Sequence, residues 1–142
     1  MFRRWLPSIV VLAAALALGA GLLTDGRVLQ AIVLLVLLVA AAVVLSPRGF
    51  PESVSDAAAR EASTRDGRAI VYWRPGCPYC ARLRVSLGRH ASRLHWVDIW
   101  QDPDGAASVR AVADGNETVP TVVASGKAFV NPSPRWVRQL TL

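Results

Sequence analysis

Cys77 and Cys80 are the only cysteines of the 142-residue chain, and two residues separate them in the stretch WRPGCPYCARL. Two thiols at this spacing can form half of a metal site, a small structural disulfide, or a redox pair that opens and closes. Zinc needs about four ligands, and the spacing of His90 and His95 from Cys77 does not suggest such a site. A structural disulfide across so short a loop would remove little chain entropy. The pattern therefore favours thiol–disulfide exchange.

The residues on either side of the pair predict that the two thiols differ. A strand is predicted over residues 68–73, and Pro78 fits the first turn of a following helix. The Cys77 sulfur would then face free backbone N–H groups and the positive end of the helix dipole, which favour the thiolate, and Arg74 adds a positive charge. Cys80 lies on the same helix face one turn deeper. We expect Cys77 to be the attacking thiol and Cys80 the resolving thiol.

The pattern after residue 67 predicts an α/β domain. A strand, a helix and a second strand form a parallel pair, and two further strands joined by Ser125-Gly126 form an antiparallel hairpin. We therefore expect a four-stranded mixed sheet with flanking helices. The predicted strands are residues 68–73, 94–100, 118–124 and 127–130, and the predicted helices are residues 78–90, 103–113 and 134–142.

Two motifs carry a resemblance to a known family. YWRPGCPYC, followed later by TVPTVV, resembles the glutaredoxin branch of the thioredoxin superfamily over roughly residues 67–142. The resemblance implies a thioredoxin-like fold and a thiol–disulfide oxidoreductase in which Cys77 is the nucleophile and Cys80 resolves. It also implies that the Val119–Pro120 peptide bond is cis and lies beside the cysteine pair, where it keeps metals away from the thiols.

The same resemblance implies a binding site for a small thiol. Arg74 matches the basic residue that meets a carboxylate of glutathione, and Tyr79 matches a wall of the ligand groove. Thr118 and Val119 match the segment whose main chain pairs with the ligand like an added strand, and Pro120 follows them. No bound metal or cofactor is implied.

The chain departs from glutaredoxins at Asn131–Pro134, where NPSP replaces the usual Gly-Gly turn and the acidic residue that binds the amino group of glutathione. This departure resembles the mycoredoxins, which serve mycothiol, a sugar-based thiol without that amino group. The expected partners are mixed disulfides between proteins and a low-molecular-weight thiol, with mycothiol or glutathione as co-substrate.

Two other functions remain open at this point. Cys77 and an external thiol could hold an iron–sulfur cluster between two copies of the domain, although Pro78 disfavours this by stiffening the loop. The domain could also act as a thiol oxidase outside the cytoplasm.

Residues 5–23 and 28–45 are two apolar runs, separated by the polar turn TDGR. Each would extend about 27 Å as a helix, close to the thickness of a hydrocarbon core. We therefore predict a transmembrane helical hairpin over residues 1–45 and the lipid bilayer as a partner. Residues 46–66 are predicted to be a linker, with a short helix from Ser53 or Ser55 to Ala62.

The distribution of arginines predicts the topology of this hairpin. Arg3, Arg4, Arg48 and Arg60 share one side, and Arg27 is alone on the other. The positive-inside rule then predicts a protein that spans the cell membrane twice, with both ends of the hairpin and the catalytic domain in the cytoplasm. A cleaved signal peptide is the alternative reading of the first run, and it would leave a single anchor.

The net charge of +6 does not indicate nucleic-acid binding. After residue 46 the basic and acidic residues are interspersed, and no basic stripe carries interleaved aromatic residues. Arginines facing anionic lipid headgroups are the simpler interpretation. The sequence does not determine an oligomeric state.

Overall fold

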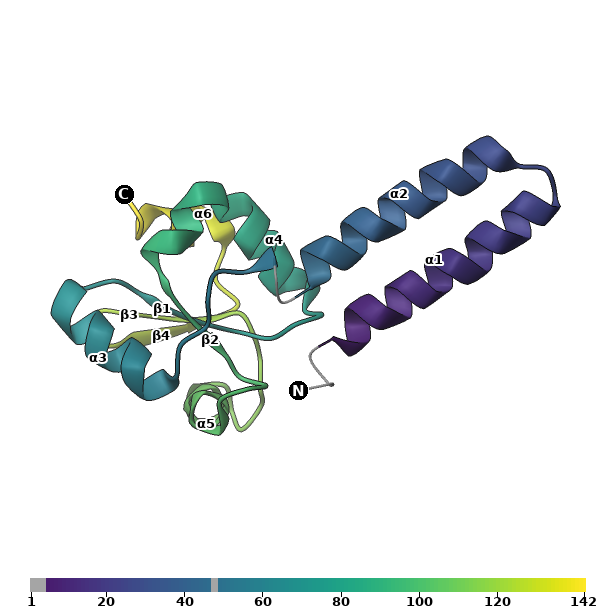
Figure 1. The fold of residues 1–142 in the computed structure, drawn as a ribbon. Coiled ribbons are helices and arrows are strands. Elements are labelled where there is room, and N and C mark those ends of the chain that lie inside the picture. The colour runs from purple at the N-terminus through teal and green to yellow at the C-terminus, as the bar shows by residue number, and fades with distance from the viewer. Residues whose placement is uncertain (1–4, 47–48) are drawn as a thin grey trace. The chain divides into compact units, whose positions relative to one another are not determined.

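The structure, a computed structural model, describes residues 5–46 and 49–142. The chain divides into two compact units, with the boundary between Gly49 and Phe50. The first unit is helical, and the second contains a sheet with helices on both faces (Figure 1).

The first unit is a hairpin of helices α1 (Leu6–Thr24) and α2 (Val28–Leu45) (Figure 1). Gly26, in the connecting turn, has a φ of 71°, a conformation that glycine adopts without a steric penalty. The helices pack along each other, and near the open end the Ser8 hydroxyl donates a 3.2 Å hydrogen bond to the carbonyl of Ala42. The two apolar helices expected from the sequence are therefore present.

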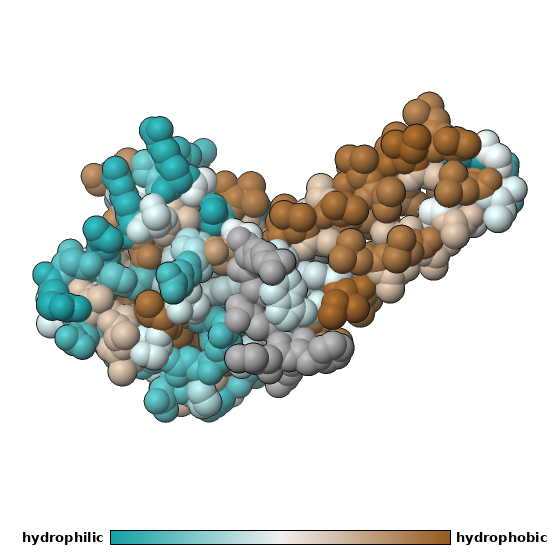
Figure 2. All heavy atoms as spheres, in the orientation of Figure 1, coloured by the Kyte–Doolittle hydropathy of each residue, from teal (hydrophilic) through white to brown (hydrophobic). Residues whose placement is uncertain are grey.

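Large apolar side chains of this hairpin point outward, and its surface is mostly hydrophobic (Figure 2). The small residues Ala15 and Ala31 are buried between the helices, whereas Leu16 and Leu29 are exposed. Within the described residues one helix, α1, is long and apolar enough to cross a membrane, with a mean hydropathy of 2.3. The apolar stretch of α2, Val28–Val44, falls short of that length.

The predicted topology of the hairpin depends mainly on four arginines near its two ends. Arg3, Arg4 and Arg48 lie outside the described residues. The orientation of the hairpin and its second span therefore stay predictions.

The second unit contains a mixed sheet in the order β2-β1-β3-β4. Its strands are β1 (Ile70–Trp73), β2 (His95–Asp98), β3 (Thr121–Ala124) and β4 (Lys127–Val130). β1 pairs in parallel with β2 and antiparallel with β3, and β3 pairs antiparallel with β4. This is the expected four-stranded thioredoxin-like arrangement. Strands β1, β2 and β3 are shorter than predicted, and β4 has the predicted length.

Helices cover both faces of the sheet (Figure 1). On one face lie α4 (Pro78–Leu87) and α6 (Pro134–Gln139), and on the other lie α5 (Pro103–Val112) and α3 (Asp56–Asp66). The predicted helix over residues 78–90 ends earlier as an α-helix, because Gly88 adopts a φ of 54°. The chain continues from there as a 3₁₀ helix, η3 (Gly88–Arg93).

Residues 50–66 belong to the second unit and are not the linker that the sequence predicts. The Ser55 hydroxyl caps α3 by accepting a hydrogen bond from the Ala58 N–H, and Gly67 ends the helix with a φ of 71°. Ala59, on the inner face of α3, is completely buried. The segment before α3 extends the sheet edge, because the Val54 N–H donates a 2.9 Å hydrogen bond to the carbonyl of Trp96.

Aromatic residues fill the core where this segment meets the sheet. The Phe50 ring stacks on Trp73 with 3.8 Å between centroids and meets Trp96 edge-on at 5.8 Å. Trp73 and Trp96 are each only 1% exposed. Trp73, the last residue of β1 and the neighbour of Arg74 in the chain, is therefore fixed by its contact with Phe50.

Candidate active site

Cys77 lies where the chain leaves β1 and enters α4. The turn at Pro75-Gly76, with a φ of 75° at Gly76, turns the chain from strand to helix, and Pro78 occupies the first helical position. Cys77 is the N-cap residue of α4, and its sulfur accepts a 3.2 Å hydrogen bond from the Cys80 N–H. The sulfur therefore faces the free N–H groups of the first helical turn, as the sequence predicts.

This environment favours the thiolate of Cys77. Hydrogen bonds from the Cys80 side chain and from the N–H groups of Cys80 and Tyr79, together with the charge of Arg74, outweigh the opposing effect of burial and lower the pKa of Cys77 from 9.0 to about 6. Cys77 is therefore ionised at neutral pH, which makes it a nucleophile.

Cys80 has the opposite character. It is completely buried, and both burial and its interactions with the Cys77 sulfur raise its pKa. Its thiol stays protonated while it donates to Cys77. A protonated, shielded thiol beside an ionised one is the arrangement expected for a resolving cysteine.

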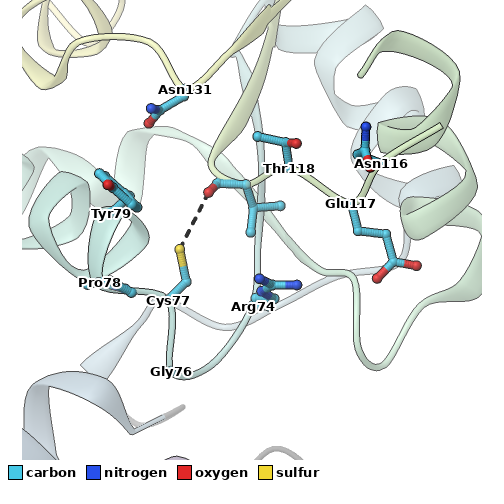
Figure 3. A pocket seen from close by; sticks show the side chains of 10 residues that line it. Arg74, Gly76, Cys77, Pro78, Tyr79, Asn116, Glu117, Thr118 and Asn131 are labelled. Carbon is cyan, nitrogen blue, oxygen red and sulfur yellow. Dashed lines mark hydrogen bonds between the residues drawn. The ribbon is translucent and has the colours of Figure 1, made fainter. Parts of the chain in front are cut away.

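The segment Thr118–Thr121 lies against the Cys77 sulfur, although more than forty residues separate them in the chain. The Val119–Pro120 peptide bond is cis, as the family resemblance implies. The Cys77 Sγ atom lies 3.4 Å from the carbonyl oxygen of Val119 (Figure 3). Cys77 donates a hydrogen bond to this oxygen when its own thiol is protonated. Two further bonds fix this segment: the Thr121 hydroxyl donates to the Thr118 carbonyl at 2.7 Å, and the Asn131 N–H donates to the Pro120 carbonyl at 2.8 Å.

An open cavity of about 580 Å³ surrounds the sulfur of Cys77. Figure 3 shows Tyr79 and Asn131 on one side of this sulfur and Arg74 and Glu117 on the other. The cavity is lined by Arg74, Gly76, Cys77, Pro78, Tyr79, Asn116, Glu117, Thr118, Val119 and Asn131. We call it the Cys77 groove.

Two charged side chains of the Cys77 groove are held from behind. The Arg74 guanidinium lies 5.9 Å from the centre of the Trp100 ring, within the range of a cation–π interaction. The Glu117 carboxylate accepts a 2.7 Å hydrogen bond from Arg110. The groove therefore offers a positioned cation close to the sulfur and a carboxylate further away.

The structure brings the predicted site residues together in one place. Arg74, Cys77, Tyr79, Thr118 and Val119 line the Cys77 groove. The two others, Cys80 and Pro120, are buried directly behind it, next in the chain to lining residues.

The groove also contains three polar residues that were not among the predicted site residues: Asn116, Glu117, and Asn131, which the sequence marks only as the start of the departure from glutaredoxins. Asn116 and Glu117 directly precede the Thr118–Pro120 motif, and this adjacency could have indicated them. Asn131 begins the segment that replaces the Gly-Gly turn, and it adopts a φ of 48°. That left-handed conformation, which Asn tolerates better than most residues, places it beside Tyr79 (Figure 3).

The groove contains the parts that thiol–disulfide exchange needs: an ionised thiol, a second thiol one helical turn away, and a lined cavity beside the sulfur. Within residues 5–46 and 49–142, no group of three or more His, Cys, Asp or Glu side chains is placed to hold a metal ion.

Comparison with known proteins supports this chemistry. Residues 69–130 match the family model described as Glutaredoxin. The matched range contains the four strands, both cysteines and the cis Val119–Pro120 bond. It supports a thiol–disulfide oxidoreductase kind of activity. Neither the search of curated proteins nor that of solved structures found a match to the chain.

Proposed function

We propose that the protein is a membrane-anchored oxidoreductase that reduces mixed disulfides between proteins and a low-molecular-weight thiol, and the match of residues 69–130 to the Glutaredoxin family model supports this proposal. The observation that carries the proposal is the position of Cys77. It is the N-cap of α4, with a pKa lowered to about 6, and it opens onto a groove large enough for a small thiol.

In the first step the Cys77 thiolate attacks the sulfur of the small thiol within the mixed disulfide. A new disulfide forms between Cys77 and the small thiol, and the substrate protein leaves as a thiolate that takes up a proton. Arg74 would bind a carboxylate of the small thiol, Tyr79 would contact its apolar part, and Thr118 and Val119 would pair with its backbone-like portion.

The second step restores the Cys77 thiolate by one of two routes. A second molecule of the small thiol attacks the disulfide on Cys77 and leaves as the oxidised small-thiol dimer. Alternatively, Cys80 loses its proton and attacks Cys77, releasing the reduced small thiol and forming a Cys77–Cys80 disulfide, which an external dithiol or two further small thiols must reduce.

The first route predicts that the two cysteines are unequally important. Cys77→Ser should lower the rate of reduction of a protein mixed disulfide by at least about 100-fold, because the remaining thiol, Cys80, is buried and protonated. Cys80→Ser makes the same sulfur-to-oxygen change but should stay within about tenfold of the parent, because an external thiol can still resolve the intermediate. Release of the small thiol from a labelled substrate protein measures both rates. A Cys77→Ser protein as active as the parent would contradict the proposal.

The small thiol is proposed to be mycothiol or glutathione. Support for a thiol other than glutathione comes from the turn after β4, where Asn131 carries a neutral amide and the residues that follow, Pro132, Ser133 and Pro134, carry no carboxylate for an amino group. Comparing mixed disulfides of the two thiols on the same substrate protein tests this choice. A preference for the glutathione adduct would exclude the mycoredoxin-like reading while leaving the oxidoreductase activity intact.

Membrane anchoring is supported by the length and composition of α1 and by the outward-facing apolar side chains of the hairpin. We propose that both helices enter the bilayer and that the second unit lies in the cytoplasm, where small thiols are kept reduced.

A further inference from the structure

The folded second unit keeps its acidic side chains away from one face, although charges of both signs are interspersed along the sequence. Apart from Asp25 in the first unit, every Asp and Glu lies within residues 50–66 or 98–117, on α3 or just before it, at the end of β2, or on α5 and the loops on either side of it. α4, η3 and α6 contain no acidic residue. They carry an exclusively basic set, which we call the arginine face: Arg82, Arg84, Arg89, Arg93, Arg135 and Arg138.

The arginine face is continuous in space. α4 packs against α6, and the guanidinium of Arg93 in η3 donates a 2.5 Å hydrogen bond to the carbonyl of Thr141 after α6. His90 lies among the arginines of both elements: burial and the charges of Arg93, Arg138 and Arg89 lower its pKa. Positive charges are therefore gathered at one place with no Asp or Glu side chain among them.

Exposed aliphatic residues lie beside these arginines. Val85 is 63% exposed on α4, and its spacing from Arg82 puts the two on one side of this helix. Leu142, next to the Thr141 that Arg93 holds, is 89% exposed. Hydrophilic side chains project from the surface above α6 in Figure 2. Arginines with interspersed aliphatic side chains suit a headgroup layer, which offers anionic groups with apolar chains beneath.

The connection to the apolar hairpin is short. Only residues 46–49 separate the end of α2 from Phe50, the first residue of the second unit. Four residues extend at most roughly 14 Å. A hairpin inserted in a membrane would therefore keep the whole second unit near the membrane surface, whatever its orientation.

We propose that the arginine face docks on the anionic headgroups of the membrane that anchors the hairpin. This inference rests on the membrane anchoring proposed above and goes beyond it, because it specifies which surface of the second unit faces the lipid. Arg89 and Arg93 follow the C-terminal end of α4, whereas Cys77 lies at its N-terminal end. Ten helical residues span about 15 Å, so docking through this end of the arginine face would leave the Cys77 groove open.

The test uses the full-length protein in nanodiscs of pure phosphatidylcholine and of phosphatidylcholine with one-third phosphatidylglycerol. Amide hydrogen exchange of α4, η3 and α6 is the readout. Protection should be stronger in the anionic nanodiscs and should fall with added salt. Each arginine near an anionic surface contributes about fivefold to binding, so Arg89→Gln with Arg138→Gln should weaken docking roughly 25-fold.

A matched control makes the same change of charge elsewhere. Arg65→Gln with Arg68→Gln alters two exposed arginines at the end of α3 and just beyond it, on the opposite face, and should leave the protection in anionic nanodiscs unchanged. Activity on a soluble mixed disulfide should be equal in both double variants, which shows that both fold. Equal protection in the two lipids, or equal loss in the two double variants, would overturn the proposal. Protection of α4, η3 and α6 that appears only when soluble polyglutamate is added would also overturn the proposal, because it would indicate that the arginine face binds an acidic protein.

Flotation with vesicles separates this inference from the anchoring on which it rests. If the hairpin is inserted, the protein floats with neutral vesicles even at high salt. In that case Arg89 and Arg138 should affect only the exchange protection measured in anionic nanodiscs. A protein that floats only with anionic vesicles, and only with both arginines present, has no inserted hairpin but still supports the arginine face. A protein that floats with neither kind of vesicle contradicts both.

Discussion

At the scale of single residues, Cys77 and Cys80 share one motif but have opposite electrostatic surroundings. The inequality could be predicted from the sequence, because Pro78 marks the helix start and so makes Cys77 the N-cap. The contact between the Cys77 sulfur and the Val119 carbonyl could be expected only through the family resemblance. It depends on tertiary packing between distant segments, which no local pattern encodes.

The reactivity of Cys77 should depend on pH accordingly. The rate at which iodoacetamide alkylates Cys77 is measured against pH in the parent and in the Cys80→Ala protein. The comparison shows which groups stabilise the Cys77 thiolate. The parent should reach half its maximal rate near pH 6. Cys80→Ala removes the hydrogen bond that lowers the pKa of Cys77 most, so its half-point should move to higher pH.

Arg74→Gln provides the comparison for this measurement. It removes the smallest of the named contributions to the lowered pKa of Cys77, so its half-point should move upward by less than that of Cys80→Ala. If the Cys80→Ala half-point stayed near pH 6, the side-chain hydrogen bond would not be the main cause of the lowered pKa.

At the scale of secondary structure, the sequence predicts α3 as a short helix that begins at Ser53 or Ser55, but it does not predict that this helix packs on the sheet. Its cap residues Ser55 and Gly67 are recognisable, but the helix DAAAREASTRD has no apolar stripe of large residues. It attaches to the sheet through small and polar contacts, chiefly Ala59 and the buried carboxyl of Asp56. Hydrophobic periodicity does not detect such an element, and a linker is the natural prediction.

The Asp56 carboxylate joins α3 to two other elements. Tyr72 of β1 donates to one of its oxygens at 2.5 Å, and Arg60 and Ser108 donate to the other at 2.8 and 3.1 Å. Asp56→Asn places an amide N–H₂ against at least one of these donors. The variant should lose about 1–3 kcal/mol of unfolding free energy, measured by urea unfolding of the full-length protein in detergent with tryptophan fluorescence as the signal.

The same variant should change how stability depends on pH. Burial opposes ionisation of Asp56, but its hydrogen bonds with Tyr72, Arg60 and Ser108 prevail and hold its pKa below the usual value. A lowered folded-state pKa stabilises the protein above the unfolded-state pKa, and this contribution is lost as the pH falls through the folded-state pKa. The parent should therefore lose more stability than Asp56→Asn between about pH 5 and pH 1. Glu61→Gln, the same change at an exposed position of α3, should behave like the parent.

At the scale of the whole molecule, the division into an apolar hairpin and an α/β unit could be predicted from composition alone. The boundary could not, and it lies at Phe50 where the sequence predicts residue 67. The absence of acidic residues from the arginine face could not be predicted from the sequence either. Arg82 and Asp98 are close in sequence, but they lie on different elements of the fold, α4 and β2. Charge patterning appears only after helices are assigned to faces.

The predicted orientation can be tested with the native cysteines. In a Cys80→Ser protein, Cys77 should react with a membrane-impermeant maleimide only after the cells are permeabilised. Asp25→Cys in a cysteine-free background should react in intact cells, because the turn between α1 and α2 would face outward. Labelling of Cys77 in intact cells would place the domain outside and favour the oxidase alternative.

The stacking of Phe50 on Trp73 has a mechanical consequence. In the membrane-anchored protein proposed above, a pull from the hairpin would enter the second unit at Phe50. The load is met there by the stacked ring of Trp73 and the edge of Trp96, and next by the hydrogen bond from Val54 to the Trp96 carbonyl. Trp73 ends the strand that leads to Cys77, so we expect this aromatic contact to limit how far a pull from the hairpin changes the geometry of Cys77.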